Sequence, residues 1–142
     1  MKTSLRPALG LAIIFLALHL PFPPASLEDL DSINFALGLH QFDVAQHQPH
    51  PPGYPVFIVI GRLVNAVSSS EARALGFVSM VSGALALLAL GPLFARWTNG
   101  DARGTAANVG ALIVASTPLF WMTAARPLSD MAGLAASSAF SC

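Results

Sequence analysis

Residues 75–94 read LGFVSMVSGALALLALGPLF, and this stretch contains no charged side chain. As an α-helix it would be about 30 Å long at 1.5 Å per residue, which matches the thickness of the hydrocarbon core of a bilayer. A helix of this length and composition is typical of a transmembrane segment. The stretch therefore predicts a helix that crosses a membrane.

The composition of the whole chain agrees with a membrane protein. Hydrophobic residues make up 54% of the 142 residues and charged residues only 10%, whereas soluble domains carry about 25% charged residues. The mean hydropathy is +0.64. A formal net charge of zero gives no reason to expect a nucleic-acid partner. The single cysteine, Cys142, excludes an internal disulfide and a thiolate metal cluster.

Two further apolar stretches are predicted to cross the membrane, at about residues 8–22 and 105–122. The first follows Lys2 and Arg6, so the positive-inside rule places its N-terminus in the cytoplasm. A secretory signal peptide is the alternative for this stretch, although no small-x-small cleavage site follows it. Residues 131–142 are too short to cross and are expected to be the start of a truncated helix.

The charges of the connecting segments predict their sides of the membrane. The segment 25–52 has no lysine or arginine but holds four acidic residues and three histidines: Glu28, Asp29, Asp31, Asp43, His40, His47 and His50. A loop without basic residues is expected outside the cytoplasm. The segment RWTNGDAR, residues 96–103, has arginines at both ends and a turn at Asn99-Gly100, so it is expected to be cytoplasmic.

The apolar stretch from Tyr54 to Val67 is ambiguous. As a helix it would span only about 21 Å, and it contains Arg62, which is costly at a bilayer centre. If it crossed, the arginine-bearing segment 96–103 would lie outside. If it lies at the interface, every loop satisfies the charge rule, with Arg62 reaching the headgroups. We therefore expect residues 25–70 to form one extracytoplasmic loop with interfacial helices.

The chain as a whole is thus predicted to be all-α. Residues 1–142 are expected to form the N-terminal part of one multi-pass transmembrane helical bundle, truncated at its C-terminus and inactive by itself. Small residues on the predicted spans, such as Gly76, Gly83, Gly91 and Gly110, would let these helices pack closely.

Asp31 is the first candidate for chemistry. Helical spacing predicts a helix over Ser32–Phe42, and Asp31 sits at its start. Its carboxylate could cap the helix by accepting backbone N–H bonds, or it could face a cavity at the membrane surface as a general base. Glu28 would share a helical face with Asp31 if the helix extended that far.

His50 is the second candidate. It precedes Pro51-Pro52-Gly53-Tyr54-Pro55, and prolines at this density fix the backbone. The segment could be simply a rigid lead into the next helix, or it could hold His50 as a proton carrier, phosphate partner or metal ligand. The spacing of His40, His47 and His50 matches no strong zinc signature.

Arg126 and Asp130 flank Pro127 at the start of the last apolar stretch. They could form an ion pair four residues apart or mark a helix start. Ionisable groups at a membrane boundary are nevertheless functional candidates. In the preferred topology they face the same compartment as Asp31.

The motifs D-S-x-x-F-A-L from Asp31, HPPGYP from His50 and R-P-L-S-D from Arg126 resemble the type C membrane glycosyltransferases. Among these, the chain is most similar to the protein O-mannosyltransferase and aminoarabinose-transferase branch, including bacterial relatives with an HPPGYP motif. The resemblance covers essentially the whole chain but only the beginning of such an enzyme. It implies inverting transfer of a sugar from a polyprenyl-phosphate donor to a protein, lipid or glycan acceptor.

The resemblance also implies roles for individual residues. Asp31 would be the general base, and His50 would contact the donor phosphate. Ser32 stands where the family commonly has a second carboxylate, which weakens the case for a bound divalent metal. The candidate site then comprises Asp31 as the catalytic residue and four substrate-binding residues: His50, Tyr54, Arg126 and Asp130. The location implied is the cell membrane, as in a bacterial inner membrane.

Two alternatives from other classes remain open. One is a fragment of a multi-pass transporter or permease whose acidic loop handles protons or cations. The other is a membrane subunit without chemistry. A transferase predicts further spans and an outer domain in the full gene, whereas a transporter predicts a repeat of the same hydropathy pattern.

Overall fold

The computed structural model describes residues 5–98 and 104–141 of the chain. Within these residues the protein is helical and has no β-strand, which confirms the all-α prediction. The elements in chain order are α1 (Leu5–His19), α2 (Leu30–His40), the 3₁₀ turn η1 (Val44–Gln46), α3 (Pro55–Asn65), α4 (Glu71–Trp97), α5 (Thr105–Ala115), α6 (Pro118–Ala125) and α7 (Asp130–Phe140).

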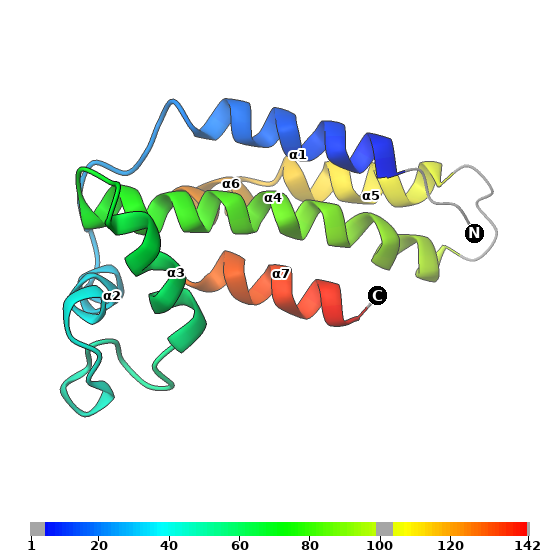
Figure 1. Cartoon of the computed structure of the whole chain (residues 1–142). Coiled ribbons are helices and arrows are strands. Elements are labelled where there is room, and N and C mark those ends of the chain that lie inside the picture. Colours follow the sequence, from blue (N-terminus) through cyan, green and yellow to red (C-terminus); the bar gives the residue numbers. More distant parts are fainter. Residues whose placement is uncertain (1–4, 99–103, 142) are drawn as a thin grey trace.

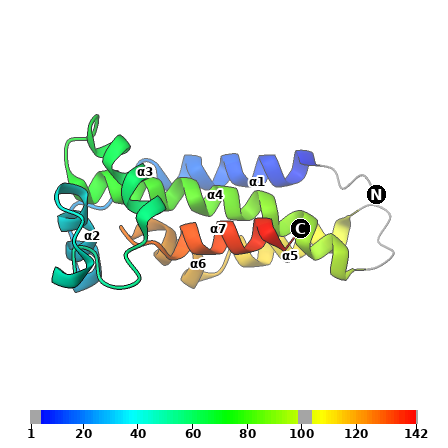
Figure 2. The ribbon, with the colours of Figure 1, turned by 60° about the horizontal axis from the view of Figure 1, so that its bottom comes forward.

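Helix α4 is the centre of the fold. It contains the long apolar stretch and contacts α1, α2, α3, α5, α6 and α7. Its first turn is capped by Ser70, whose hydroxyl accepts the N–H of Arg73 at 3.3 Å. Figure 1 shows α1, α4, α5 and α7 running along the long axis of the molecule, and Figure 2 shows the same arrangement from another side. The long apolar helix is therefore surrounded by the other helices.

In the described residues, α4 is the one unbroken helix that is long and apolar enough to cross a membrane. The α5–α6 pair would be a second span if the two helices are taken together, but they are bent by 60° relative to each other. Helices α1 and α3 are apolar but shorter. One clear candidate span is thus present, and the multi-pass arrangement stays a prediction.

The break between α5 and α6 corrects the expectation of a single helix over residues 105–122. Pro118 is the first residue of α6 and has no N–H to continue the helical hydrogen bonds. Thr117 caps α6 instead: its hydroxyl accepts the N–H of Phe120 at 3.3 Å and donates to the carbonyl of Val114 at 2.8 Å. The run of apolar residues continues across the break before Pro118, but the helical backbone hydrogen bonds are interrupted there.

Small residues let the helices approach closely, as the sequence predicts. A Cβ atom built on Gly83 of α4 would lie 3.1 Å from the ring of Phe15 in α1. A Cβ on Gly110 of α5 would lie 3.0 Å from the ring of Phe94 in α4. Both distances are below ordinary van der Waals contact between carbon atoms. These glycines therefore allow α1 and α5 to pack directly on α4.

Two segments that are distant in sequence meet at one end of the molecule. Helices α2 and α3 lie at the end where α4 begins, and the α6–α7 connection lies in the same half (Figure 1). The end of α4 and the start of α5 lie at the other end (Figure 1). The expected turn at Asn99-Gly100 lies outside the described residues. The acidic loop and the segment before Asp130 thus share one end, and its extracytoplasmic side stays a prediction.

Helix α3 packs at this end against α2 and α4. The side chain of Arg62 contacts α2, because one guanidinium N–H donates to the carbonyl of Gly38 at 2.9 Å. This bond satisfies a carbonyl near the C-terminus of α2, where helical partners run out. Arg62 therefore ties α3 to α2, a contact that the expectation of headgroup contact did not include.

Candidate functional site

The start of α2 is fixed by a reciprocal cap between Asp29 and Ser32. The Ser32 N–H donates to Oδ1 of Asp29 at 2.7 Å, and the Asp29 N–H donates to Oγ of Ser32 at 3.3 Å. This arrangement is a capping box with Asp29 at the N-cap. The alternative that Asp31 caps the helix is therefore wrong. Glu28 precedes the cap and does not share a helical face with Asp31.

Asp31 lies in the first turn of α2 with its side chain 60% exposed. Its Oδ1 atom is 3.5 Å from Nδ1 of His50, which is within the range of an ion pair but long for a hydrogen bond. The Nδ1 atom is buried and has no hydrogen-bond partner. The structure therefore brings together the two residues that carry the leading chemical predictions.

His50 is placed by the loop between α2 and α3. Its carbonyl accepts the N–H of Gly53 at 2.9 Å, which closes a turn through the two prolines. Gly53 has a φ of +93°, a conformation that other residues rarely adopt. Tyr54 follows with a φ of +45° and precedes α3 as its N-cap residue. The same turn therefore both leads rigidly into α3 and fixes the position of His50.

Arg126 does not pair with Asp130 four residues later. Its Nη2 atom instead donates to Oδ2 of Asp29 at 2.6 Å, across 97 residues of sequence. Arg126 is the C-cap residue that follows α6, and Asp130 begins α7, so the helix-start interpretation of Asp130 is correct. A carboxylate in the first turn is stabilised by the helix dipole. The ion pair joins the α6–α7 connection to the cap of the helix that bears Asp31.

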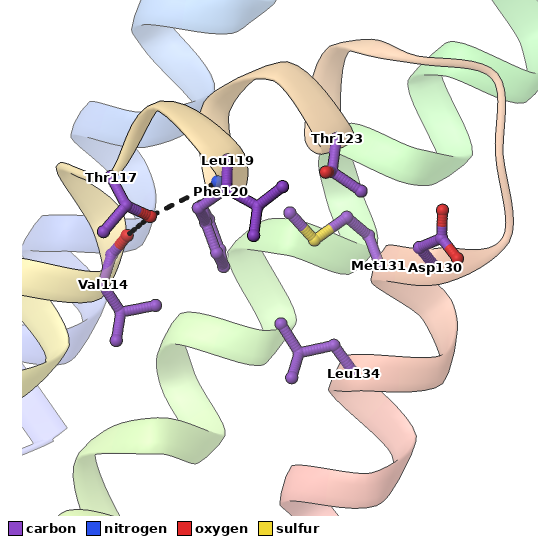
Figure 3. Close-up of a pocket in the computed structure, with 8 residues that line it drawn as sticks. All are labelled: Val114, Thr117, Leu119, Phe120, Thr123, Asp130, Met131 and Leu134. Carbon is purple, nitrogen blue, oxygen red and sulfur yellow. Dashed lines mark hydrogen bonds between the residues drawn. The ribbon is translucent and has the colours of Figure 1, made fainter.

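Asp130 lies on an open groove of about 490 Å³ between α5, α6 and α7. Figure 3 shows Asp130 and Thr123 at one end of this groove, with Val114 and Leu134 toward the other. The lining is mostly apolar: Val114, Thr117, Leu119, Phe120, Thr123, Asp130, Met131 and Leu134. Asp130 thus lines a groove whose lining includes none of the other predicted site residues.

The histidines of the loop before α3 were candidate metal ligands in the sequence. No group of three or more His, Cys, Asp or Glu side chains in the described residues is arranged to hold an ion. His40 of the expected histidine set lies apart from His50 and pairs with Glu71 of α4, its Nε2 atom 3.0 Å from Oε1. The three histidines of the loop therefore do not form a cluster.

Asp29 is the site residue that sequence reasoning missed. A signal was present, because Asp29-Leu30-Asp31-Ser32 has a capping residue followed three positions later by a side chain that can reach back. The pairing of Asp29 with Arg126 has no local signal, since it depends on the tertiary path of the chain.

An apolar helical fold with one candidate membrane span, in which Asp31 of α2 lies beside His50 of the proline-rich loop, is compatible with a membrane-associated protein. Comparison with protein families gives the particular family. Residues 31–127 match the family described as the Protein O-mannosyl-transferase TMEM260 N-terminal domain, and the chain belongs to this family. No curated protein and no solved structure shows significant similarity to the chain.

The family match covers part of the candidate site. It begins at Asp31 and includes His50, Tyr54 and Arg126, whereas Asp29 and Asp130 lie outside it. The resemblance to protein O-mannosyltransferases is thus confirmed at the level of a mannosyltransferase-like family. This family favours a glycosyltransferase over the transporter alternative. A bacterial branch with the HPPGYP motif stays a prediction.

Proposed function

We propose that this chain is part of a membrane glycosyltransferase that moves a sugar, mannose by the family's description, from a polyprenyl-phosphate donor to a hydroxyl of a protein acceptor. The reaction takes place on the extracytoplasmic face and inverts the anomeric carbon. Asp31 is the general base that removes the proton of the attacking hydroxyl.

One observation supports this proposal: the carboxylate of Asp31 does not cap α2 and is therefore available for catalysis. Asp29 caps α2, and the Asp31 side chain remains 60% exposed beside His50. A general base must be able to reach the proton that it removes. An exposed carboxylate in the first turn of a capped helix meets this requirement.

The donor side of the site is assigned to the other residues that sequence analysis selected. His50 lies next to the proposed base and is proposed to contact the donor phosphate. Tyr54 contacts the His50 ring, with 5.3 Å between centroids. Arg126 is 48% exposed and has further N–H groups besides the one given to Asp29, so we keep it as a phosphate contact. Asp130 is proposed to line the substrate site through its groove.

The proposed location suits a donor of this kind. A polyprenyl chain dissolves in the bilayer and presents its phosphate at the interface, while the acceptor arrives from water. Holding both reactants beside a base supplies a large part of the catalysis by positioning alone. The end of the molecule that carries α2 and α3 would then lie at the membrane surface (Figure 1).

The direct experiment compares Asp31→Asn with Asp43→Asn in the full-length protein in membranes. Mannose transfer from mannosyl-phosphoryl polyprenol to a peptide acceptor is measured. Asp31→Asn should reduce transfer by about 10²- to 10⁴-fold, the usual contribution of general acid–base catalysis. Asp43 caps η1, where Asn is also a good cap, so its variant should transfer normally. Unchanged transfer by Asp31→Asn would contradict the assignment.

A further inference from the structure

The imidazole ring of His50 is held in a defined orientation. It contacts Phe35 of α2 and Tyr54 of the loop, and these two rings also contact each other, with 5.3 Å between ring centroids in all three contacts. The side chain is only 24% exposed, and the preceding Pro49 is fully buried. The two ring nitrogens therefore keep different surroundings.

The nitrogen Nδ1 is the buried one. It has no hydrogen-bond partner and lies 3.5 Å from Oδ1 of Asp31. A buried polar atom without a partner is rare in folded proteins. Catalytic hydrogen bonds are often long in the absence of substrate and shorten in the reacting complex. The position of Asp31 marks it as the partner of Nδ1, which leaves Nε2 as the nitrogen available to a ligand.

We infer that Asp31 and His50 form a coupled pair in which Asp31 holds the proton of His50 on Nδ1 and His50 donates a second proton from Nε2 to the leaving phosphate. The substrate in this inference rests on the proposed function. The pairing itself rests on the geometry alone. Asp31 from α2 and Tyr54 from the loop are the titratable groups seen in contact with the ring in the described residues.

The carboxylate of Asp31 has one oxygen for each partner. Oδ1 faces the imidazole, and the side chain is otherwise largely exposed. Oδ2 is therefore open to the acceptor hydroxyl. A carboxylate can accept hydrogen bonds at both oxygens, so the two tasks are compatible. The nearby Asp29 does not compete, because its two oxygens are used by Ser32 and Arg126.

The step balances in protons and electrons. The acceptor oxygen forms a bond to the anomeric carbon, and its proton passes to Oδ2 of Asp31. The bond between the anomeric carbon and the phosphate oxygen breaks, and its electron pair stays on that oxygen. The protonated His50 gives its Nε2 proton to the same phosphate, which leaves as a monoester. Exchange of protons with water then restores both groups.

The pairing is tested without any sugar transfer. In the 142-residue chain in detergent micelles, labelled with ¹⁵N-histidine, nitrogen chemical shifts report which nitrogen of a neutral ring carries the proton. His50 should carry it on Nδ1, and Asp31→Ala should move it toward Nε2. Asp43→Asn should change neither, and a His50→Gln variant assigns the signal. The signals of His19 and His40 report whether the fold is kept. An Nε2–H ring in the parent chain, or no change in Asp31→Ala, would overturn the pairing.

The role of His50 as a proton donor is tested in the full-length protein by steady-state transfer. His50→Gln should lower kcat by about 10²- to 10⁴-fold with little change in KM. Imidazole in the buffer should restore part of the transfer in His50→Ala. His47→Asn is the matched control, because His47 is exposed in the same loop and its φ of +59° suits Asn.

The outcomes separate this inference from the proposed function. A raised KM with unchanged kcat in His50→Gln would show a binding contact only and would refute the proton donor while the transferase stands. If the parent protein transfers no sugar, the proposed function fails. The histidine tautomer in the parent chain and in Asp31→Ala still decides the pairing in that case.

Discussion

Asp29 and Arg126 lie 97 residues apart in sequence, yet Oδ2 of Asp29 accepts a hydrogen bond from Nη2 of Arg126 at 2.6 Å. The other oxygen of the same carboxylate caps α2 by accepting the N–H of Ser32 at 2.7 Å. One side chain thus joins the α6–α7 connection to the first turn of the helix that carries Asp31. The position of the proposed base depends on a contact between two distant parts of the chain.

The two tasks of Asp29 can be separated by substitution. Asp29→Ser keeps a capping side chain and loses the ion pair, so we expect a loss of less than about 1 kcal/mol in the free energy of unfolding, because the pair is partly exposed. Asp29→Ala loses the cap as well and should cost about 1 kcal/mol more. Denaturant unfolding in micelles, followed by circular dichroism, measures both.

A double-mutant cycle tests the ion pair itself. Asp29→Ser combined with Arg126→Gln should cost less than the sum of the single variants, because each single change already removes the pair. Strictly additive losses would show that the contact contributes nothing to stability. The Asp29–Arg126 ion pair would then not stabilise the contact between the α6–α7 connection and the start of α2.

Gly76 should not tolerate alanine. A Cβ atom on Gly76 of α4 would overlap the ring of Pro24, in the segment that leads to α2. Overpacking of this kind typically costs about 1–3 kcal/mol. Gly10→Ala is the control, since nothing lies within 4 Å of a Cβ built there and alanine is the better helix former. Thermal unfolding should show a lower midpoint for Gly76→Ala and an equal or higher one for Gly10→Ala. A reversed order would contradict this packing.

The bend between α5 and α6 should depend on Pro118. Pro118→Ala restores a backbone N–H at the break, so the two helices can continue into each other and the 60° bend should decrease. Spin labels at Thr105 and Met122, both exposed, would report a longer distance by pulsed electron resonance in a Cys142→Ser background. An unchanged distance would show that packing against α4 and α7, rather than the proline, sets the bend.

The sidedness of the chain can be tested by labelling. Single cysteines at Ala45 or Asn99, introduced with Cys142→Ser, are exposed to a membrane-impermeant reagent on intact cells. The positive-inside rule predicts labelling at position 45 and protection at position 99. The reverse pattern would place the Asp31 end of the molecule in the cytoplasm and would contradict an extracytoplasmic reaction.

Local sequence signals predicted much of the fold. The charge-free stretch 75–94 gave the central helix, and Gly83 and Gly110 were correctly expected at close helix contacts. The boundary of α2 was misplaced by two residues, because the spacing of apolar residues does not identify which of two nearby aspartates is the cap. An apolar pattern likewise does not report a missing backbone N–H, so the α5–α6 break was missed.

The sequence proposed candidate site residues but did not predict the contacts between them. Asp31 and His50 were chosen for separate reasons, and their proximity follows from the turn at Gly53 and the packing of His50 on Phe35. Of the two alternatives for Arg126 and Asp130, the ion pair does not form, because Arg126 pairs with Asp29, which is distant in sequence but close in space. Such long-range pairing follows only from the packed arrangement of the helices.

The proposed mechanism depends most on Asp31 as the base, and kcat for mannose transfer by the full-length protein tests this role most directly. Asp31→Asn should lower kcat by about 10²- to 10⁴-fold, because the amide cannot accept the acceptor's proton. Asp31→Glu, which keeps a carboxylate, should retain more activity than Asp31→Asn, and Asp43→Asn should match the parent protein. An Asp31→Asn protein that inserts normally and transfers mannose at the parental rate would contradict the account.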